Sequence, residues 1–185
     1  RWLTRSFRIS DDGGDFTLTR AEARTLLAQI VGRYAPTRYW RLQDGALLVD
    51  GGTGDGSIGW VLGAEEWTDY AVEFTTTPLA TGAGGYAQAG WAFRVQDERN
   101  AYVWILGNRD VGDGPGNLTR AVFVNGAPQV TTVALPFRIE PGTAYRVRTE
   151  AVGSTVTTTI DGVVVDTVED ATFTSGSVGF RQAGT

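Results

Sequence analysis

Apolar and polar residues follow a helical period near the start of the chain. Over residues 19–33, apolar side chains recur at spacings of three and four between Ala23 and Ile30, which places them on one face of a helix. Thr19 and Glu22 have the T-x-x-E spacing of a capping box, which satisfies the first backbone N–H groups of a helix. The pattern therefore predicts one short N-terminal helix over residues 19–33.

After residue 36 the period becomes two, which is typical of strands with one face in a core. Asp-Gly and Asn-Gly pairs separate many of the runs and favour tight turns. Strands at this density, without interleaved helices, indicate an antiparallel sandwich or barrel. The runs predict strands at residues 38–43, 46–50, 57–62, 69–77, 87–96, 100–107, 118–125, 129–134, 144–152, 154–160, 163–168 and 176–182.

The first residues of the chain carry little pattern. Residues 1–18 are expected either to pair as an edge strand or to belong to a neighbouring domain. The chain has 185 residues, enough to bury the core of a single domain. We therefore expect an N-terminal extension, residues 1–36, whose helix packs on a sandwich formed by residues 37–185.

Composition removes several classes of function. The net charge is −5, which argues against nucleic acid and anionic membranes as partners. The chain has no His and no Cys, which excludes Ser-His-Asp and Cys-His catalysis. Any metal ion would have to be held by oxygen ligands, so Ca²⁺ is the first candidate. The chain opens RWLTRSFRIS, contains no Met, and uses Arg for all 16 basic residues. We expect a module cut from a longer protein, or a processed chain, that is secreted by a bacterium.

The hairpin AGWAFRVQDERNAYVW, residues 89–104, concentrates aromatic and polar side chains. A three-residue loop, 97–99, would place Tyr102 and Trp104 on an open face of the hairpin. A loop of four residues would place both among the core aromatics, because a slip of one residue reverses every side chain. We expect the three-residue loop, since it lets Val103 join the core.

With that loop, one open face would combine flat aromatic rings with a guanidinium, a carboxylate and an amide. Sugars bind such mixtures, because their C–H faces stack on aromatic rings and their hydroxyls need fixed donors and acceptors. The alternative, that the two polar turn residues only shape the turn, stays open. The candidate sugar-binding residues are Arg94, Asp97, Asn100, Tyr102 and Trp104.

This hairpin is part of a longer layout, W-x-D-Y … A-G-x-x-F-R-x-x-D-x-x-N-x-Y … D-G … G-x-V-G-F. Over about residues 60–185 the layout resembles the concanavalin A-like lectin/glucanase superfamily, and within it carbohydrate-binding module family 67, the rhamnose-binding module of family 78 α-L-rhamnosidases. The resemblance implies an all-β, two-sheet antiparallel jelly-roll β-sandwich. In that family an adjacent Asp-Asn pair takes part in calcium-dependent sugar binding. Asn100 matches the Asn, but Arg99 stands in the Asp place, so Asp97 with Asn100 is the candidate calcium site.

The resemblance implies a non-catalytic carbohydrate-binding module that binds a glycan or terminal monosaccharide. We expect a monomeric module tethered to the catalytic domain of a secreted glycan-degrading enzyme. One alternative is a small hydrolase or lyase that uses an acidic pair around Glu73, Asp97 or Asp110, although the E-x-D-x-x-E motif of laminarinase-type relatives is absent. A structural spacer within a larger glycosidase is the other.

Overall fold

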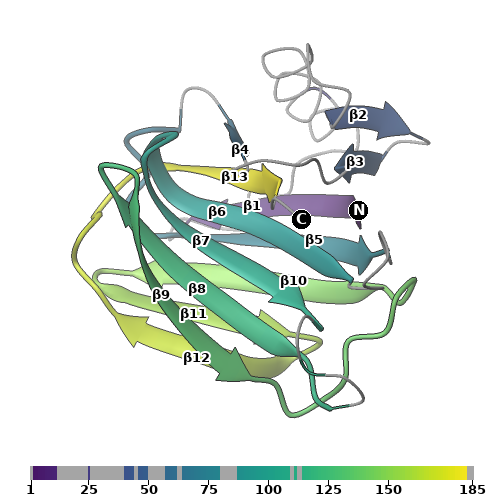
Figure 1. Ribbon diagram of the computed structural model, residues 1–185. Coiled ribbons are helices and arrows are strands. Elements are labelled where there is room, and N and C mark those ends of the chain that lie inside the picture. Colours follow the sequence, from purple (N-terminus) through teal and green to yellow (C-terminus); the bar gives the residue numbers. More distant parts are fainter. Residues whose placement is uncertain are drawn as a thin grey trace.

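The computed structural model describes residues 2–11, 25, 40–43, 46–49, 57–61, 64–79, 87–108, 111 and 114–182. These residues form two antiparallel sheets packed face to face, which confirms the predicted all-β jelly-roll β-sandwich (Figure 1). The predicted helix over residues 19–33 lies, apart from Thr25, outside the described residues. Within the described part of the chain, no helix is long and apolar enough to cross a membrane.

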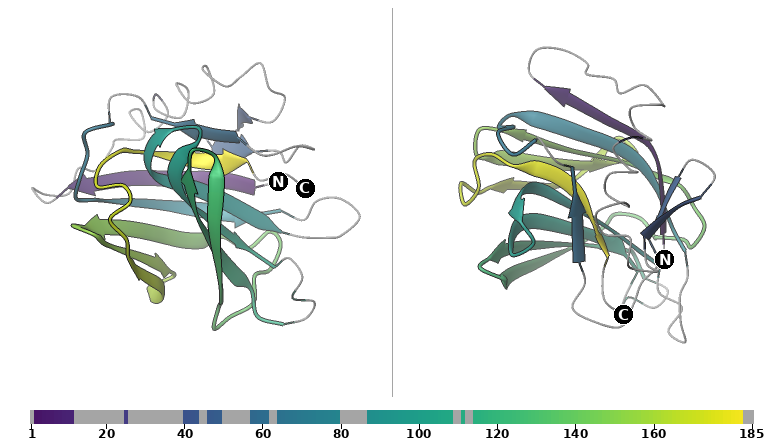
Figure 2. Two further views of the ribbon diagram at one scale, coloured as in Figure 1. Left: turned by 60° about the vertical axis from the view of Figure 1, so that its left-hand side comes forward. Right: turned by 90° about the horizontal axis from the view of Figure 1, so that it is seen from above.

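From residue 40 onward the strands follow the predicted runs to within a few residues. Figure 2 shows the two layers from the side and from above. In spatial order, the larger sheet contains β12 (Val163–Glu169), β11 (Thr155–Ile160), β10 (Tyr145–Val152), β5 (Tyr70–Pro78), β1 (Trp2–Asp11), β3 (Ala46–Val49) and β2 (Trp40–Gln43). The smaller sheet contains β4 (Ser57–Trp60), β13 (Ser177–Gln182), β6 (Gln88–Asp97), β7 (Asn100–Gly107), β8 (Asn117–Val124) and β9 (Ala127–Ala134).

Strand β1 corrects the expectation of an edge strand. It pairs with β5 on one side and with β3 on the other, so it lies inside the larger sheet. Residues 2–11 therefore belong to the sandwich and not to an extension packed on it. The predicted domain boundary at residue 36 lies outside the described residues.

The main core lies between the sheets and is rich in aromatic rings. Trp91 and Trp104 stack nearly parallel, with their ring centroids 6.4 Å apart. A second apolar cluster, which includes Ala92, Val95 and Val103, is buried on the outer face of the smaller sheet. Strands β6 and β7 are thus apolar on both faces, and simple alternation does not reveal which face points inward.

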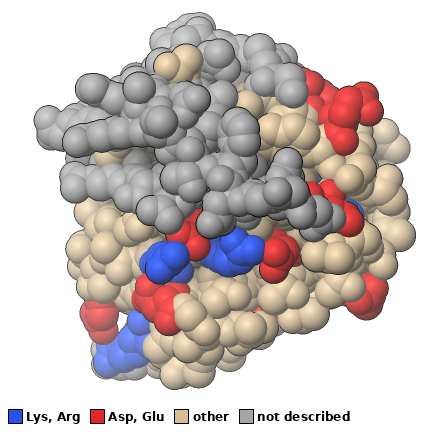
Figure 3. All heavy atoms as spheres, turned by 180° about the vertical axis from the view of Figure 1, so that it is seen from behind, with Lys and Arg blue, Asp and Glu red and all other residues tan. Residues whose placement is uncertain are grey.

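The outer face of the larger sheet carries charges of both signs. Arg146 on β10 forms an ion pair with Glu73 on β5 at 2.8 Å, and Arg148 pairs with Glu150 at 2.7 Å. Seen from behind, basic and acidic side chains lie next to one another (Figure 3). Glu73, one of the acids in the hydrolase alternative, therefore has an arginine partner, and Asp110 lies outside the described residues.

Candidate functional site

The β6–β7 hairpin has a different register from the one that the pattern favoured. Phe93 lies opposite Tyr102, Asp97 lies opposite Asn100, and the register shifts between these two pairs. This irregularity, a β-bulge, turns Tyr102 and Trp104 into the core, where both are fully buried. The predicted open face for these two aromatics is wrong, and neither has exposed surface on which a sugar could stack.

Arg94 sits in that bulge with φ of 46° and is fully buried. Its guanidinium donates hydrogen bonds to the backbone carbonyls of Phe173 (2.9 Å), Thr68 (2.9 Å) and Gly153 (2.8 Å). Asp69 lies 3.6 Å away as its charge partner. Arg94 therefore ties three loops together at one end of the sandwich, and its predicted place on an open sugar-binding face is also wrong.

Asp97 and Asn100 do come together, at the exposed hairpin turn. The Asn100 amide donates to both carboxylate oxygens of Asp97 at 3.0 Å, and the Arg99 N–H donates to Asp97 at 2.7 Å. Slight burial would raise the pKa of Asp97, but the hydrogen bonds from Asn100 and Arg99 outweigh it and hold that pKa below its usual value. The oxygen of the Asn100 amide accepts the N–H of Asn125.

These contacts do not fit a calcium site. Ca²⁺ takes six to eight oxygen ligands, whereas the oxygens of Asp97 and Asn100 face N–H donors. Within the described ranges, no group of three or more acidic side chains is placed to hold a metal ion. The geometry matches the alternative in which the two residues shape the turn and link it to the β8–β9 turn.

A row of polar side chains runs across the inner face of the larger sheet, and the sequence pattern did not reveal it. Thr149, Thr158 and Asp166 are cross-strand neighbours on β10, β11 and β12. The Trp91 indole N–H donates to Thr149 at 2.9 Å, and the Trp104 indole N–H donates to Asp166 at 3.1 Å. The two stacked tryptophans of one sheet thus rest on a polar row of the other.

Asp166 is the charged end of this row, and a second β-bulge directs it inward. Thr158 lies opposite Asp166 while Thr159 lies opposite Val164, so one extra residue interrupts the alternation on β12. Arg120 on β8 donates from Nη1 to both carboxylate oxygens of Asp166 at 2.6 Å. A buried carboxylate is costly without such a partner.

Tyr102 and Asp170 extend the cluster toward the end of β12. The Tyr102 hydroxyl donates to the Asp170 carboxylate at 2.8 Å and accepts the N–H of Phe173 at 3.1 Å. Burial, with a further contribution from Asp170, raises the pKa of Tyr102 to about 12. Burial would also raise the pKa of Asp170, but hydrogen bonds from Thr172 and Tyr102 and the charge of Arg120 lower it below its ordinary value.

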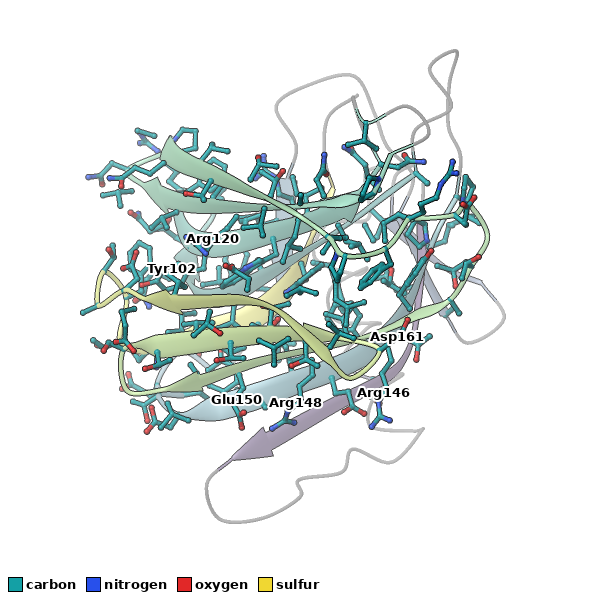
Figure 4. All side chains as sticks on the ribbon, turned by 90° about the horizontal axis from the view of Figure 1, so that it is seen from below. Tyr102, Arg120, Arg146, Arg148, Glu150 and Asp161 are labelled. Atoms are coloured by element: carbon teal, nitrogen blue, oxygen red, sulfur yellow. The ribbon has the colours of Figure 1, made fainter. Side chains whose placement is uncertain are left out.

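We call Tyr102, Trp104, Arg120, Asp166 and Asp170 the inter-sheet cluster. Seen from below, Tyr102 and Arg120 lie between the two layers (Figure 4). The Arg120 side chain is 14% exposed, and its hydrogen bonds to Asp166 both run from Nη1. The cluster therefore holds a carboxylate and a guanidinium in fixed positions beside the edge of the sandwich.

Edge strand β9 lies beside Arg120 and is exposed along nearly its whole length. Thr131 lies opposite Arg120 and Gln129 lies opposite the core residue Val122, so both side chains are on the inner face of the smaller sheet. A hydroxyl and an amide thus lie exposed on the same face as the guanidinium. An ion pair, an amide and a hydroxyl at one open edge can hold a ligand that is rich in hydroxyl groups.

Comparisons with known proteins give the fold. No protein-family model matches the chain, and no curated protein matches it. A carbohydrate binding module, CBM66 from Bacillus subtilis, matches with a TM-score of 0.59 and 23% identity, covering 77% of this chain and 81% of that one. A GH43_12 from a capybara gut metagenome matches with a TM-score of 0.50 and 11% identity, covering 78% of this chain but 31% of that one. The chain has the concanavalin A-like fold, as predicted. The narrower likeness to family 67 stays a prediction.

Proposed function

We propose that the chain is a non-catalytic carbohydrate-binding domain whose site is the inter-sheet cluster together with Gln129 and Thr131. The observation that carries this proposal is the Arg120–Asp166 pair, in which a bulge directs a carboxylate inward to fix a guanidinium at the open edge of the sandwich. Fixed donors and acceptors beside an exposed strand suit hydroxyl groups at defined positions on a sugar.

Each group has a separate role in this proposal. Arg120 donates to sugar hydroxyls through the nitrogen atoms that Asp166 does not occupy. Gln129 offers both an acceptor and donors, and Thr131 offers a hydroxyl. Trp104 holds Asp166 in place from within the core and does not stack on the ligand, because it has no exposed surface.

The solved structures with similar folds support a binding role within a larger protein. One of them is named as a carbohydrate binding module, and another, GH43_12, is a chain of which this fold makes up about a third. We therefore extend the proposal to a module that binds a terminal sugar and tethers a glycan-degrading enzyme to its substrate outside the cell, which raises the local substrate concentration. Calcium is not part of this proposal, because the turn at Asp97 and Asn100 does not fit it.

The test is an NMR titration of the isotope-labelled chain with terminal monosaccharides and oligosaccharides. The proposal expects amide shifts to concentrate on β8, β9 and the end of β12. Thr131→Ala should weaken binding about five- to tenfold, as expected when a hydrogen bond is lost. Thr132→Ala is the matched control, since Thr132 lies opposite Thr119 and points to the other face of β9.

The pair of threonine variants makes the result decisive. Equal affinities for Thr131→Ala and Thr132→Ala would remove β9 from the site. Shifts confined to the turn that contains Asn100 would move the site to the hairpin predicted from the sequence. No shifts with any sugar would contradict carbohydrate binding by this domain.

A further inference from the structure

The inter-sheet cluster contains one cation and two anions. Asp166 and Asp170 both act on Arg120, the first through hydrogen bonds of 2.6 Å and the second through its charge. The other guanidinium nearby, that of Arg94, has Asp69 as its own charge partner at 3.6 Å. At neutral pH the cluster therefore carries one net negative charge.

The second carboxylate is fixed in the structure. Asp170 accepts the Tyr102 hydroxyl and the Thr172 N–H, both at 2.8 Å. These donors stabilise the ionised form, so Asp170 keeps its charge at neutral pH. A partly exposed arginine in a sugar site is ordinarily an anion receptor, but Asp166 already pairs with Arg120 here.

We infer that the site takes neutral, hydroxyl-rich sugars and rejects sugars that carry a carboxylate, and that Asp170 sets this preference. This inference rests on the proposed function and names the ligand class of the same site. A uronate placed beside Arg120 would meet the second negative charge of the cluster, that of Asp170. The chain as a whole has a net charge of −5 and adds a repulsion of the same sign.

The experiment compares matched sugars. The methyl glycosides of glucose and galactose, and those of the corresponding uronic acids, are titrated against the whole chain in low salt. A single extra charge in a partly solvated site corresponds to about tenfold in Kd, so the neutral sugar should bind about tenfold more tightly than its uronate. Raising NaCl from about 20 mM to about 500 mM should bring the ratio of the two Kd values closer to one, because salt screens the repulsion.

Two variants locate the effect. Asp170→Asn keeps an acceptor for Tyr102 but removes one negative charge, and should bring the ratio close to one. Asp161→Asn removes the same charge from the β11–β12 turn, which lies far from Tyr102 and Arg120 (Figure 4), and should leave the ratio unchanged.

Each outcome decides the inference. Equal binding of neutral and acidic sugars by the unmodified chain, or tighter binding of the uronates, would overturn the charge preference while leaving the proposed function intact. An unchanged ratio in a folded Asp170→Asn chain would remove Asp170 as its origin. If neither sugar class binds, the proposed function fails and the preference fails with it.

Discussion

Arg94 offers the sharpest test of how this sandwich is held together, through an Arg94→Met substitution. Methionine fills much of the same volume but donates no hydrogen bond. The change leaves the backbone carbonyls of Thr68, Gly153 and Phe173 without their donor. Three charge-assisted hydrogen bonds at about 1.5 kcal/mol each give about 4.5 kcal/mol, within the range of about 3–5 kcal/mol for breaking a buried ion pair.

That loss is a large share of the roughly 5–15 kcal/mol by which a domain is stable. For a chain of this size it corresponds to a fall in Tm of roughly 10–20 °C. Urea unfolding and differential scanning calorimetry measure the two quantities independently. The stability of Arg94→Lys should lie between those of Arg94→Met and the parent chain, because an ammonium keeps the charge but lacks the planar fork of donors.

The control is Arg99→Met, the same substitution at an exposed turn. The Arg99 side chain donates a hydrogen bond to the carbonyl of Asn125, and the loss of this exposed bond should cost less than about 1 kcal/mol. If Arg94→Met lowers the free energy of unfolding no more than Arg99→Met does, Arg94 does not tie the three loops together.

Three further expectations follow from single contacts. Gly176→Ala should lower the free energy of unfolding by more than about 2 kcal/mol in urea, since a Cβ there would lie 2.5 Å from a backbone carbon of β6. Gly142→Ala, with open space around it, should lower it by about 1 kcal/mol. Similar losses in the two variants would contradict the close contact at Gly176. The pKa of Asp170 is lower in the folded chain than in the unfolded chain, where it is about 3.9. The ionised Asp170 therefore stabilises the fold above the unfolded pKa, and this contribution is lost as pH falls through the folded pKa. In thermal melts the Tm should fall below about pH 4, and it should fall less steeply in Asp170→Asn. A chelator should change neither Tm nor sugar affinity, and a loss of either in the parent chain but not in Asn100→Ala would show that the turn at Asp97 and Asn100 holds a cation.

Most of the fold could be predicted from the sequence. The two-residue period and the Gly-containing turns located the strands from β2 to β13, because side-chain alternation and turn geometry are local properties. Neither alternative for the first residues, an edge strand or part of a neighbouring domain, foresaw that β1 lies inside the larger sheet. Which strands become neighbours depends on pairing over long distances, and the pattern of a single strand does not record it.

The direction of the hairpin side chains could not be predicted. Ala92 and Val95 on the outer face of β6 are buried like Trp91 and Phe93 on the inner face, so the pattern does not mark an inside. A bulge at Arg94 then changes the parity between the core part of the strand and its turn. The motif that suggested a sugar site therefore consists largely of residues that hold the fold together.

The sequence by itself determined the strands, their turns and an all-β sandwich, since these follow from local periodicity and turn chemistry. Only the tertiary structure decided which polar side chains meet. Arg120 and Asp166 are 46 residues apart, on strands of different sheets, and a bulge in β12 turns the carboxylate inward. Asp166, a single acid within the apolar run VVVDTV, is the one local signal in the sequence of the Arg120–Asp166 pair. Its arginine partner becomes apparent only when the two sheets pack together, because contacts between sheets join residues whose separation along the chain carries no pattern.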